Sequence, residues 1–549
     1  MKTFSSIRKR SIFWSLFLCL IIGNIQAQQF DWANSIGGLG LDVGRAIATD
    51  DNGNVFVAGS FTGGTHIADT FLTGYGGMEA FMAKYTSEGQ FLWARVISGP
   101  AEDMARGLIT DNLGNVFVVG HFTDTVVFSI TQNDTIAAKS EGMQDVFVAK
   151  YDANGNLLWN LTAGGLGNDT GTNIDRYKWS GKLYVSGGFE KRAKFGTTAL
   201  LSTGLTDAFL LKIDPDGNAH WAKKGGGLEH DMAASVAVNQ TNGSIYIAGD
   251  FYGQANFEQE EIEAAGSSDV FLAKFQPDGT MEWVRTNGGT SVDVATAIGT
   301  DLNGKVYVSG YYQGTTFFQN HLATAISYND VFVAQFNAEG NCNWLSSAGS
   351  WGLDNASGLA VDWDGTTYLT GMFEEQIITA TDSSSGNGYE IFVLVHDSYG
   401  QVKYVRSAGA ASADIGMAAC LGPDQSLYLT GYYFYFAEFD NNTIGAADHG
   451  DAFVARMTDV LEVDDQSNSN RFVDCFEFNQ TSFSLKNRCG LKGSWSIISA
   501  SGQLIDSETL QGENHLPKLP KGLSFLMVET PNGRFTKKLI NLVEAPVSW

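Results

Sequence analysis

Short runs of alternating apolar and polar residues, separated by tight turns, fill most of the chain. In the first copy of the pattern these runs are Val43–Thr49, Asn54–Phe61, Ala80–Tyr85 and Phe91–Ile97. A period of two residues is that of a β-strand with one buried face. The turns carry Gly and Asn, which adopt the positive φ that a tight hairpin needs. No repeat has a helical period, so the pattern predicts an all-β protein built from four-stranded units.

The four-strand pattern recurs along the chain. A phrase made of an acid, a small or branched residue, Phe and a further apolar residue occurs seven times, at intervals of 66, 62, 62, 61, 60 and 61 residues. It begins at Glu79, Asp145, Asp207, Asp269, Asp330, Glu390 and Asp451. Seven such repeats predict a seven-bladed β-propeller over residues 28–457, whereas a β-solenoid usually has shorter repeats. Phe30–Ile36 reads as an outer strand, so we expect it to complete the last blade and close the ring.

Two further residues recur in every repeat, and each has a functional and a structural interpretation. The aromatic series is Trp32, Trp93, Trp159, Trp221, Trp283, Trp344 and Tyr404. The loop that follows carries Asp42, Asp103, Asp169, Asp231, Asp293, Asp354 or Asp414. The Trp residues could stack on sugars, but strand spacing favours blade core. The acids could bind cations. A residue that is present in every blade, however, more often has a structural role, such as capping backbone N–H groups or contacting Lys84 or Lys150.

The N-terminus has the pattern of an export signal. Four basic residues precede the apolar run Ser11–Gly23, and Ile25-Gln26-Ala27 offers a cleavage site, so residues 1–27 are predicted to be a signal peptide. The run is shorter than the roughly 20 residues that span a bilayer. No transmembrane segment is expected in the mature chain.

After residue 457 the repeats stop. Residues 458–470 are polar and are expected to form a linker, and residues 471–549 resume an alternating pattern that suits a small β-sandwich. Its expected strands are Phe483–Leu485, Trp495–Ser499, Leu523–Glu529 and Phe535–Ile540. Cys475 and Cys489 are either a disulfide, as suits an exported protein, or two small buried residues.

The repeat resembles the SBBP family of bacterial β-propeller repeats, with its DaFvaK phrase, D-x-x-G-n turn, and W followed by GG. The resemblance spans roughly residues 29–457 and implies the fold without implying an activity. Leu519–Glu529, Asn532-Gly533 and Thr536–Ile540 are similar to the C-terminal sorting domain of type IX secretion substrates, although the Pro-Asn-Pro motif that often opens such domains is missing. This second resemblance implies the secretion machinery as a partner. It also implies a protein that is secreted or attached to the outer-membrane surface.

The net charge of the chain argues against some classes of binding partner. Loss of the four basic residues of the leader takes the formal charge from −26 to −30. Such a chain is unsuited to nucleic acid or to an anionic bilayer, both of which attract clustered Lys and Arg. The repeated acids are expected to disfavour acidic ligands and to tolerate neutral glycans or basic protein surfaces.

The positions that vary inside the fixed repeat are the candidates for binding. The residue after the Gly that ends the second strand is Ser60, His121, Gly188, Asp250, Tyr311, Met372 or Tyr432. Tyr311, Tyr432 and Tyr435 are the predicted ligand-binding residues, because Tyr combines rigid contact area with a hydroxyl. The alternative is that these loops pack on their own blade. Tyr312 and Tyr433 occupy a fixed aromatic position that could belong to the core.

The sequence contains weak signals for catalysis. The eight His residues occupy different repeat positions, and the one local acid–base cluster is Glu229-His230-Asp231. We therefore predict no catalytic residue, metal site or cofactor. The expected function is that of a monomeric, non-enzymatic scaffold or adhesin that binds glycan or protein. The alternative is a secreted polysaccharide hydrolase or lyase with an axial active site.

Overall fold

A computed structural model describes most of the chain. The described residues are 29–130, 135–446, 449–458, 476–479, 484–487, 494–499, 504–509, 513–515, 522–530 and 533–541. Every regular element among them is a strand, which confirms the all-β class. Within these residues no helix is long and apolar enough to cross a membrane. The predicted signal peptide, nearly all of the predicted linker, and both Cys475 and Cys489 lie outside the described residues.

Four antiparallel strands form each unit of the repeat region. Unit 1 is β2 (Val43–Thr49), β3 (Val55–Ile67), β4 (Thr70–Tyr85) and β5 (Phe91–Ile97). Unit 2 is β6 (Asp103–Thr110), β7 (Val116–Ile130), β8 (Thr135–Tyr151) and β9 (Leu157–Gly165). Unit 3 is β10 (Thr170–Tyr177), β11 (Lys182–Phe195), β12 (Thr198–Ile213) and β13 (Ala219–Gly227). Unit 4 is β14 (Met232–Val238), β15 (Ile245–Phe251), β18 (Asp269–Phe275) and β19 (Met281–Gly289).

The same order continues to the end of the repeats. Unit 5 is β20 (Asp293–Thr300), β21 (Val306–Phe318), β22 (His321–Phe336) and β23 (Cys342–Ala348). Unit 6 is β24 (Asn355–Val361), β25 (Thr367–Ile378), β26 (Ser383–His396) and β27 (Val402–Ala408). Unit 7 is β28 (Ile415–Leu421), β29 (Leu427–Tyr433), β32 (Asp451–Thr458) and β1 (Gln29–Gly38).

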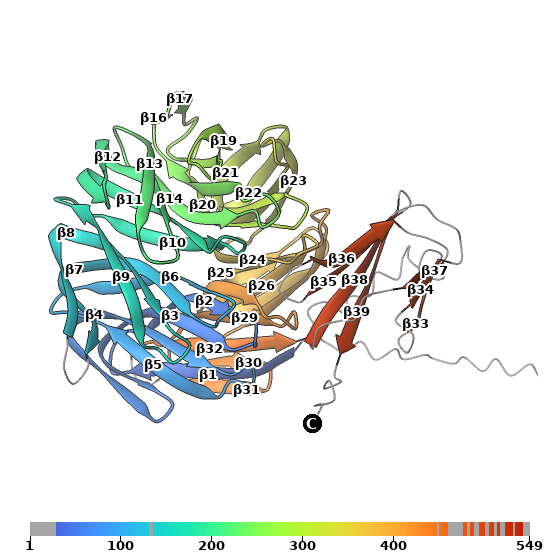
Figure 1. The fold of residues 1–549 in the computed structure, drawn as a ribbon, viewed down its shortest axis with the longest axis horizontal. Helices are drawn as coiled ribbons and strands as arrows, with labels where there is room; N and C mark the ends of the chain where they lie inside the picture. The colour runs from blue at the N-terminus through green and yellow to red at the C-terminus, as the bar shows by residue number, and fades with distance from the viewer. Residues whose placement is uncertain are drawn as a thin grey trace, which may run out of the picture.

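The units follow one another around a common centre (Figure 1). The first strand of each unit is the inner strand, and inner strands of successive units contact each other in the order β2, β6, β10, β14, β20, β24 and β28. Strand β28 also contacts β2. Hydrogen bonds cross between these strands, such as Thr110 Oγ1 to the Thr49 carbonyl at 2.7 Å and Thr49 Oγ1 to the Leu421 carbonyl at 2.9 Å.

Strand β1 lies between the last and the first units. It pairs with β32 from Gln29 opposite Thr458 to Ile36 opposite Ala452, and its end pairs with β3, Gly38 opposite Thr65. The side chains of Phe30 and Ile36 are buried. The blue β1 and the orange β32 accordingly lie side by side in Figure 1.

The second and third strands of the units are longer than the alternation predicted. Strand β3 continues beyond Phe61 to Ile67, and β4 begins at Thr70 rather than at Ala80. A shift of register between Thr62 and Gly64 interrupts the strand pairing, which hides the extension from a period-two pattern. In units 4 and 7 the extension forms separate hairpins, β16 (Gln254–Phe257) with β17 (Glu260–Glu263), and β30 (Phe436–Phe439) with β31 (Asn442–Gly445). We call this outer hairpin the arm of the unit.

Each arm pairs with the end of the outer strand of the preceding unit. The paired residues include Gly38 and Thr65, Ser98 and Val127, Gly165 and Ala193, Gly227 and Ala255, Gly289 and Thr316, Gly349 and Ile378, and Gly409 and Glu438. This contact explains the Gly-Gly pair of the repeat. A Cβ atom at Gly165 would lie 1.9 Å from the Arg192 carbonyl oxygen, and one at Gly164 would lie 2.5 Å from the Asp145 carboxylate.

The repeated Trp residues pack between units, which supports the structural interpretation. The Trp93 ring lies 6.0 Å from the Phe56 ring of its own unit, and its Nε1 donates to the Ala153 carbonyl of unit 2 at 3.0 Å. Trp159 Nε1 donates in the same way to the Pro215 carbonyl of unit 3 at 3.0 Å. Each of these rings joins one unit to the hairpin turn of the next.

The C-terminal region forms two antiparallel sheets. One contains β33 (Phe476–Asn479), β34 (Ser484–Asn487) and β37 (Glu513–His515). The other has the order β36 (Leu504–Thr509), β35 (Ser494–Ser499), β38 (Gly522–Thr530) and β39 (Gly533–Asn541). Strands β35, β38 and β39 coincide within a few residues with the expected strands. The side chains of Trp495 and Ile497 in β35 are buried.

Deletion of residues 28–37 is expected to abolish cooperative folding. The deletion removes the pairing partner of β32, exposes the edge that β3 presents, and removes the buried side chains of Phe30 and Ile36. Thermal unfolding followed by circular dichroism should show a broad, low-temperature transition in place of a sharp one. A truncated protein that melts like the parent would contradict this role of β1.

Candidate functional site

Two cavities open at opposite ends of the inner strands. One, of about 810 Å³, is lined by the C-terminal ends of those strands and by the turns that follow them. The other, of about 550 Å³, is lined by their N-terminal halves. We name the two ends the turn face and the arm face, because the arms project from the second. Cavities of this size suit small ligands or single side groups of larger ones.

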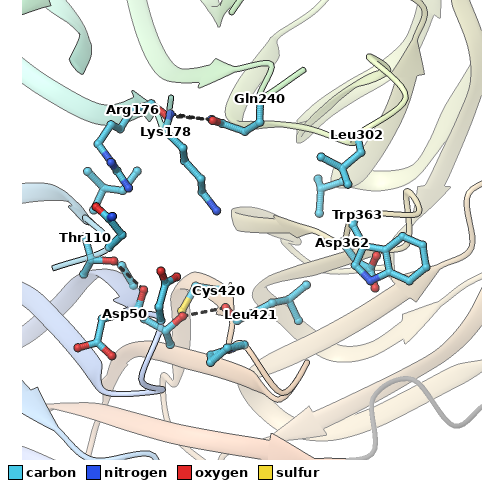
Figure 2. Close-up of a pocket in the computed structure, with 18 of the residues that line it drawn as sticks. Asp50, Thr110, Arg176, Lys178, Gln240, Leu302, Asp362, Trp363, Cys420 and Leu421 are labelled. Carbon is cyan, nitrogen blue, oxygen red and sulfur yellow. Dashed lines mark hydrogen bonds between the residues drawn. The ribbon is translucent and has the colours of Figure 1, made fainter. Parts of the chain in front are cut away.

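The turn-face cavity is lined by both charged and apolar side chains, and its lining departs from the repeat in unit 3. Most units place an Asp-led turn here, whereas unit 3 has Arg176, Lys178 and Trp179. Figure 2 shows the Lys178 side chain extending into the opening, and Asp50 and Asp362 on its wall. Gln240 Nε2 donates to the Arg176 carbonyl at 2.8 Å, which ties unit 3 to unit 4 across the rim.

A β-bulge at the same position of every inner strand shapes the arm-face cavity. The strand register shifts around one residue of each strand, and that residue lines the cavity. The seven bulge residues are Arg45, Arg106, Thr172, Ala234, Thr296, Ser357 and Met417. Bulges redirect a side chain out of the strand's alternation. They therefore turn one side chain per unit toward the axis.

Two of these bulge residues are arginines from neighbouring units. Arg45 Nε donates to Ser60 Oγ at 3.4 Å, and Arg106 Nε lies 3.3 Å from His121 Nδ1. A guanidinium has only donors, so His121 accepts through Nδ1 and carries its proton on Nε2. Burial and the two nearby arginines lower the pKa of His121 to about 3, which keeps the imidazole neutral.

The part of the cavity wall contributed by the other units carries one carboxylate and several hydroxyls among apolar side chains. Asp250 and Tyr311, from units 4 and 5, both line it. They are close enough to interact electrostatically. Burial, followed by the nearby Asp231, raises the pKa of Asp250 to about 7. The hydroxyls of Thr172, Thr296 and Ser357 lie in the same wall.

The structure separates the three predicted binding residues. Tyr311 lines the arm-face cavity, and Tyr432 is half-buried at the equivalent position of unit 7. Tyr435 lies outside the cavity in the connection before β30, 73% exposed and with a φ of 61°. Tyr312 and Tyr433 are fully buried, so the fixed aromatic position belongs to the core.

The repeated loop acids hold the junctions between units. Each is fully buried, and none lines either cavity. In the junction of units 3 and 4, Asp231 accepts from the Gly227 N–H at 2.6 Å and from the Tyr252 N–H at 3.2 Å. Its own N–H donates to the Thr206 carbonyl at 2.8 Å. This geometry supports the capping interpretation.

One detail of the capping interpretation is wrong. Lys84 and Lys150 do not meet the loop acids, because they lie at the other end of the third strand. Lys84 Nζ is 3.8 Å from Asp50, and Lys150 Nζ is 3.7 Å from Asp111. These partners are the acids that begin the hairpin turns.

The structure places the members of the cluster Glu229-His230-Asp231 in the junction between units 3 and 4. Asp231 is the buried capping residue of its junction, and His230 Nδ1 lies 3.1 Å from Thr206 Oγ1. In the part of the chain that the structure describes, no three His, Cys, Asp or Glu side chains are grouped to hold a metal ion. Cys342 and Cys420 are free thiols.

Comparison with known proteins gives the fold. A family model described as a domain of unknown function, a DUF5122 beta-propeller, matches residues 240–282. An uncharacterized WD repeat-containing protein of Acanthamoeba polyphaga mimivirus is 23% identical over 433 residues, covering 65% of this chain and 31% of that protein. The chain is a β-propeller repeat protein.

Other similarities to this β-propeller repeat protein are more distant. The regulatory protein FlaEY of Caulobacter vibrioides is 26% identical over 336 residues, covering 57% of this chain and 34% of that protein. The chain thus spans about a third of the length of these curated relatives. Among solved structures, Sqt1 of Chaetomium thermophilum matches with a TM-score of 0.36 and 11% identity, covering 74% of this chain and 83% of that one. An apocarotenoid oxygenase of Synechocystis matches with a TM-score of 0.30 and 10% identity, covering 68% and 95%.

The bulge residues are the functional candidates that sequence reasoning missed. They vary from unit to unit inside a fixed frame, as do the residues after the second strand. The same argument would have found Arg45 and Arg106 if the inner strand had been compared position by position. The direction of the Arg45 and Arg106 side chains could not be predicted, because the alternation of apolar and polar residues does not reveal a β-bulge.

Because the junction acids are buried, we expect the free energy of unfolding to increase as the pH falls from about 9 to about 6.5. Burial raises the pKa of Asp42 and of Asp103 to about 8, and that of Asp169 to about 7, well above an unfolded value of about 3.9. Over this range the folded protein takes up protons that the unfolded chain does not bind. The melting temperature should therefore be higher near pH 6.5 than near pH 9.

The Asp42→Asn and Asp103→Asn double variant provides the control for this pH dependence. It removes two of the titrating groups and should show a smaller difference between the two melting temperatures. An unchanged difference would show that other groups control the dependence.

Proposed function

We propose that the protein is an exported, non-enzymatic binding scaffold or adhesin whose arm face receives a glycan or a protein. The observation that carries the proposal is a set of exposed apolar side chains on that face. Leu39, Leu166, Leu228 and Trp351 occupy the loops between the outer strand of one unit and the inner strand of the next, and they are between 67% and 77% exposed. Exposed apolar groups that recur beside a cavity are typical of an interaction surface.

The arm face suits recognition better than the rest of the surface. It combines these apolar residues, the exposed Tyr435 and the arm-face cavity with its varied bulge residues. The turn face consists largely of repeated hairpins, such as the one in which Asp50 Oδ1 accepts from the N–H groups of Asn52 and Asn54 at 2.9 Å. Because these turns resemble one another, they offer few distinct contacts with which the protein could select one partner over another.

The finer architecture is also part of the proposal. We propose a closed, seven-bladed propeller of the SBBP type, in which β1 completes the blade of β28, β29 and β32. The pairing of β1 with β32 and the contact of β28 with β2 support this arrangement. The module that contains β33–β39 is proposed to be a small sandwich that acts as a sorting domain. The mature protein would be a monomer, secreted or attached to the outer-membrane surface, with the secretion machinery as a second partner.

The composition of the arm-face cavity favours a binding function over a hydrolytic one. A glycosidase of the usual kind needs two carboxyl groups about 5–10 Å apart. Among the described residues that line the arm-face cavity, Asp250 is the one carboxylate. A polysaccharide hydrolase or lyase at this face would need its second acid to come from elsewhere.

Substitution of Tyr311 or Tyr432 by Ala should weaken glycan or protein binding roughly tenfold or more while leaving the fold intact. Both side chains are half-buried near the axis rather than in a blade core. A glycan array probed with the mature protein should identify a ligand, and titration of that ligand should give the affinities. Tyr433→Ala, at a fully buried position, is the matched control that should lose stability. Unchanged binding in both test variants, or loss of folding in both, would remove these residues from the site.

Removal of residues 471–549 should leave the rest of the protein in the periplasm. In the sorting proposal these residues direct passage across the outer membrane, whereas the leader directs passage across the inner one. Fractionation and surface labelling of cells that produce the full chain or the truncated chain would measure the difference. Undiminished surface display of the truncated chain would contradict the proposal.

A further inference from the structure

The two arginines of the arm-face cavity have no acidic partner. Arg45 and Arg106 project from the bulges of β2 and β6, which are neighbouring inner strands. Within the described residues neither guanidinium forms an ion pair, and each uses Nε for a neutral side chain of its own unit, Ser60 or His121. Both side chains line the cavity.

This arrangement is unfavourable without a ligand. Two like charges in a half-enclosed space repel each other, and burial removes part of their hydration. Burial and the neighbouring Arg106 lower the pKa of Arg45 to about 10. Elsewhere in the protein a buried cation meets an acid, as Lys84 meets Asp50. An unpaired pair of guanidinium groups that is held in place by side-chain hydrogen bonds is instead typical of a site that receives an anion.

The remainder of the cavity selects the kind of anion. The wall contributed by the other units contains the hydroxyl of Ser357, the phenol of Tyr311 and the carboxylate of Asp250. It also contains the hydroxyls of Thr172 and Thr296, which donate to the carbonyls of Ala233 and Ser309 and can accept from a ligand. These groups can exchange hydrogen bonds with a ligand that carries many hydroxyls. The volume of about 550 Å³ is within the range of small-ligand sites. An acidic sugar carries both an anionic group, which suits the two arginines, and hydroxyls, which suit the rest of the wall.

We propose that the arm-face cavity binds an acidic sugar, with its anionic group held between Arg45 and Arg106 and its hydroxyls toward Thr172, Thr296 and Asp250. This inference rests on the proposed function and deepens it, since it gives the class of glycan. It reverses the expectation of neutral or basic ligands. That expectation placed the repeated acids at the binding surface, whereas the structure buries them in the junctions between units.

Isothermal titration of the mature protein tests the proposal with defined probes. The probes are glucuronate, glucose 6-phosphate and glucose 6-sulfate, which distinguish the anionic groups, and glucose, which has none. At least one acidic sugar should bind, and glucose should bind roughly tenfold or more weakly. Arg45→Gln with Arg106→Gln should abolish the difference between acidic and neutral sugar. Arg192→Gln, an exposed arginine on β11, is the control for loss of positive charge and should bind like the parent.

Thermal stability separates loss of binding from loss of folding. The double variant loses two positive charges that repel each other and have no acidic partner. Its melting temperature without ligand should therefore equal or exceed that of the parent. Failure of every acidic sugar to bind the parent, equal binding of glucose, or equal binding to the double variant would overturn the proposal. Poly-glutamate that binds when the sugars do not would also overturn it, in favour of an acidic peptide. Array binding of neutral glycans, together with failure of every acidic sugar to bind the parent, would uphold the scaffold function and reject the anion site.

Discussion

The pairing of each arm with the outer strand of the preceding unit is the contact on which the rest of the molecule depends. It ties the end of each unit to the next unit, either by strand pairing, as between β9 and β11, or by a single bridge, as between Ser98 and Val127. The close approach of the two backbones leaves no room for a Cβ, as at Gly165 against the Arg192 carbonyl. The Gly pair, which four of the seven repeats carry, is therefore a requirement of assembly and not of local turn geometry.

The buried acids belong to the same junction. Asp231 accepts N–H groups from the Gly pair of unit 3 and from the start of the arm of unit 4, so one carboxylate holds two elements of adjacent units. Neutral side chains of similar length would satisfy fewer of these donors. The cost is burial of a carboxylate beside a second acid, as with Asp231 and Asp207, and this raises its pKa. A large share of the acidic residues thus serves assembly rather than recognition.

Recognition is left to the positions that the junctions do not use. The bulge residue of each inner strand varies from Arg to Met around the axis. Exposed apolar residues, which are Leu39, Leu166, Leu228 and Trp351, and the exposed Tyr435 lie in the loops of the arm face. A constant frame with seven independent positions at its centre can present a different chemistry on each side of one cavity. In this protein one side is cationic and the other carries hydroxyls and a carboxylate.

The sequence by itself determined the strand class, the repeat and much of the core. Val43–Thr49 and Phe91–Ile97 have the predicted bounds, and Tyr312 and Tyr433 are buried, because alternation and turn chemistry are local properties. Tertiary structure decided the arms, whose pairing partners lie in the preceding unit, as Ala193 pairs with Gly165. It also decided where the acids lie and which side chains meet at the axis. Arg45 and Arg106 are 61 residues apart in the printed sequence, and only a bulge in each strand and the contact of two inner strands bring them together.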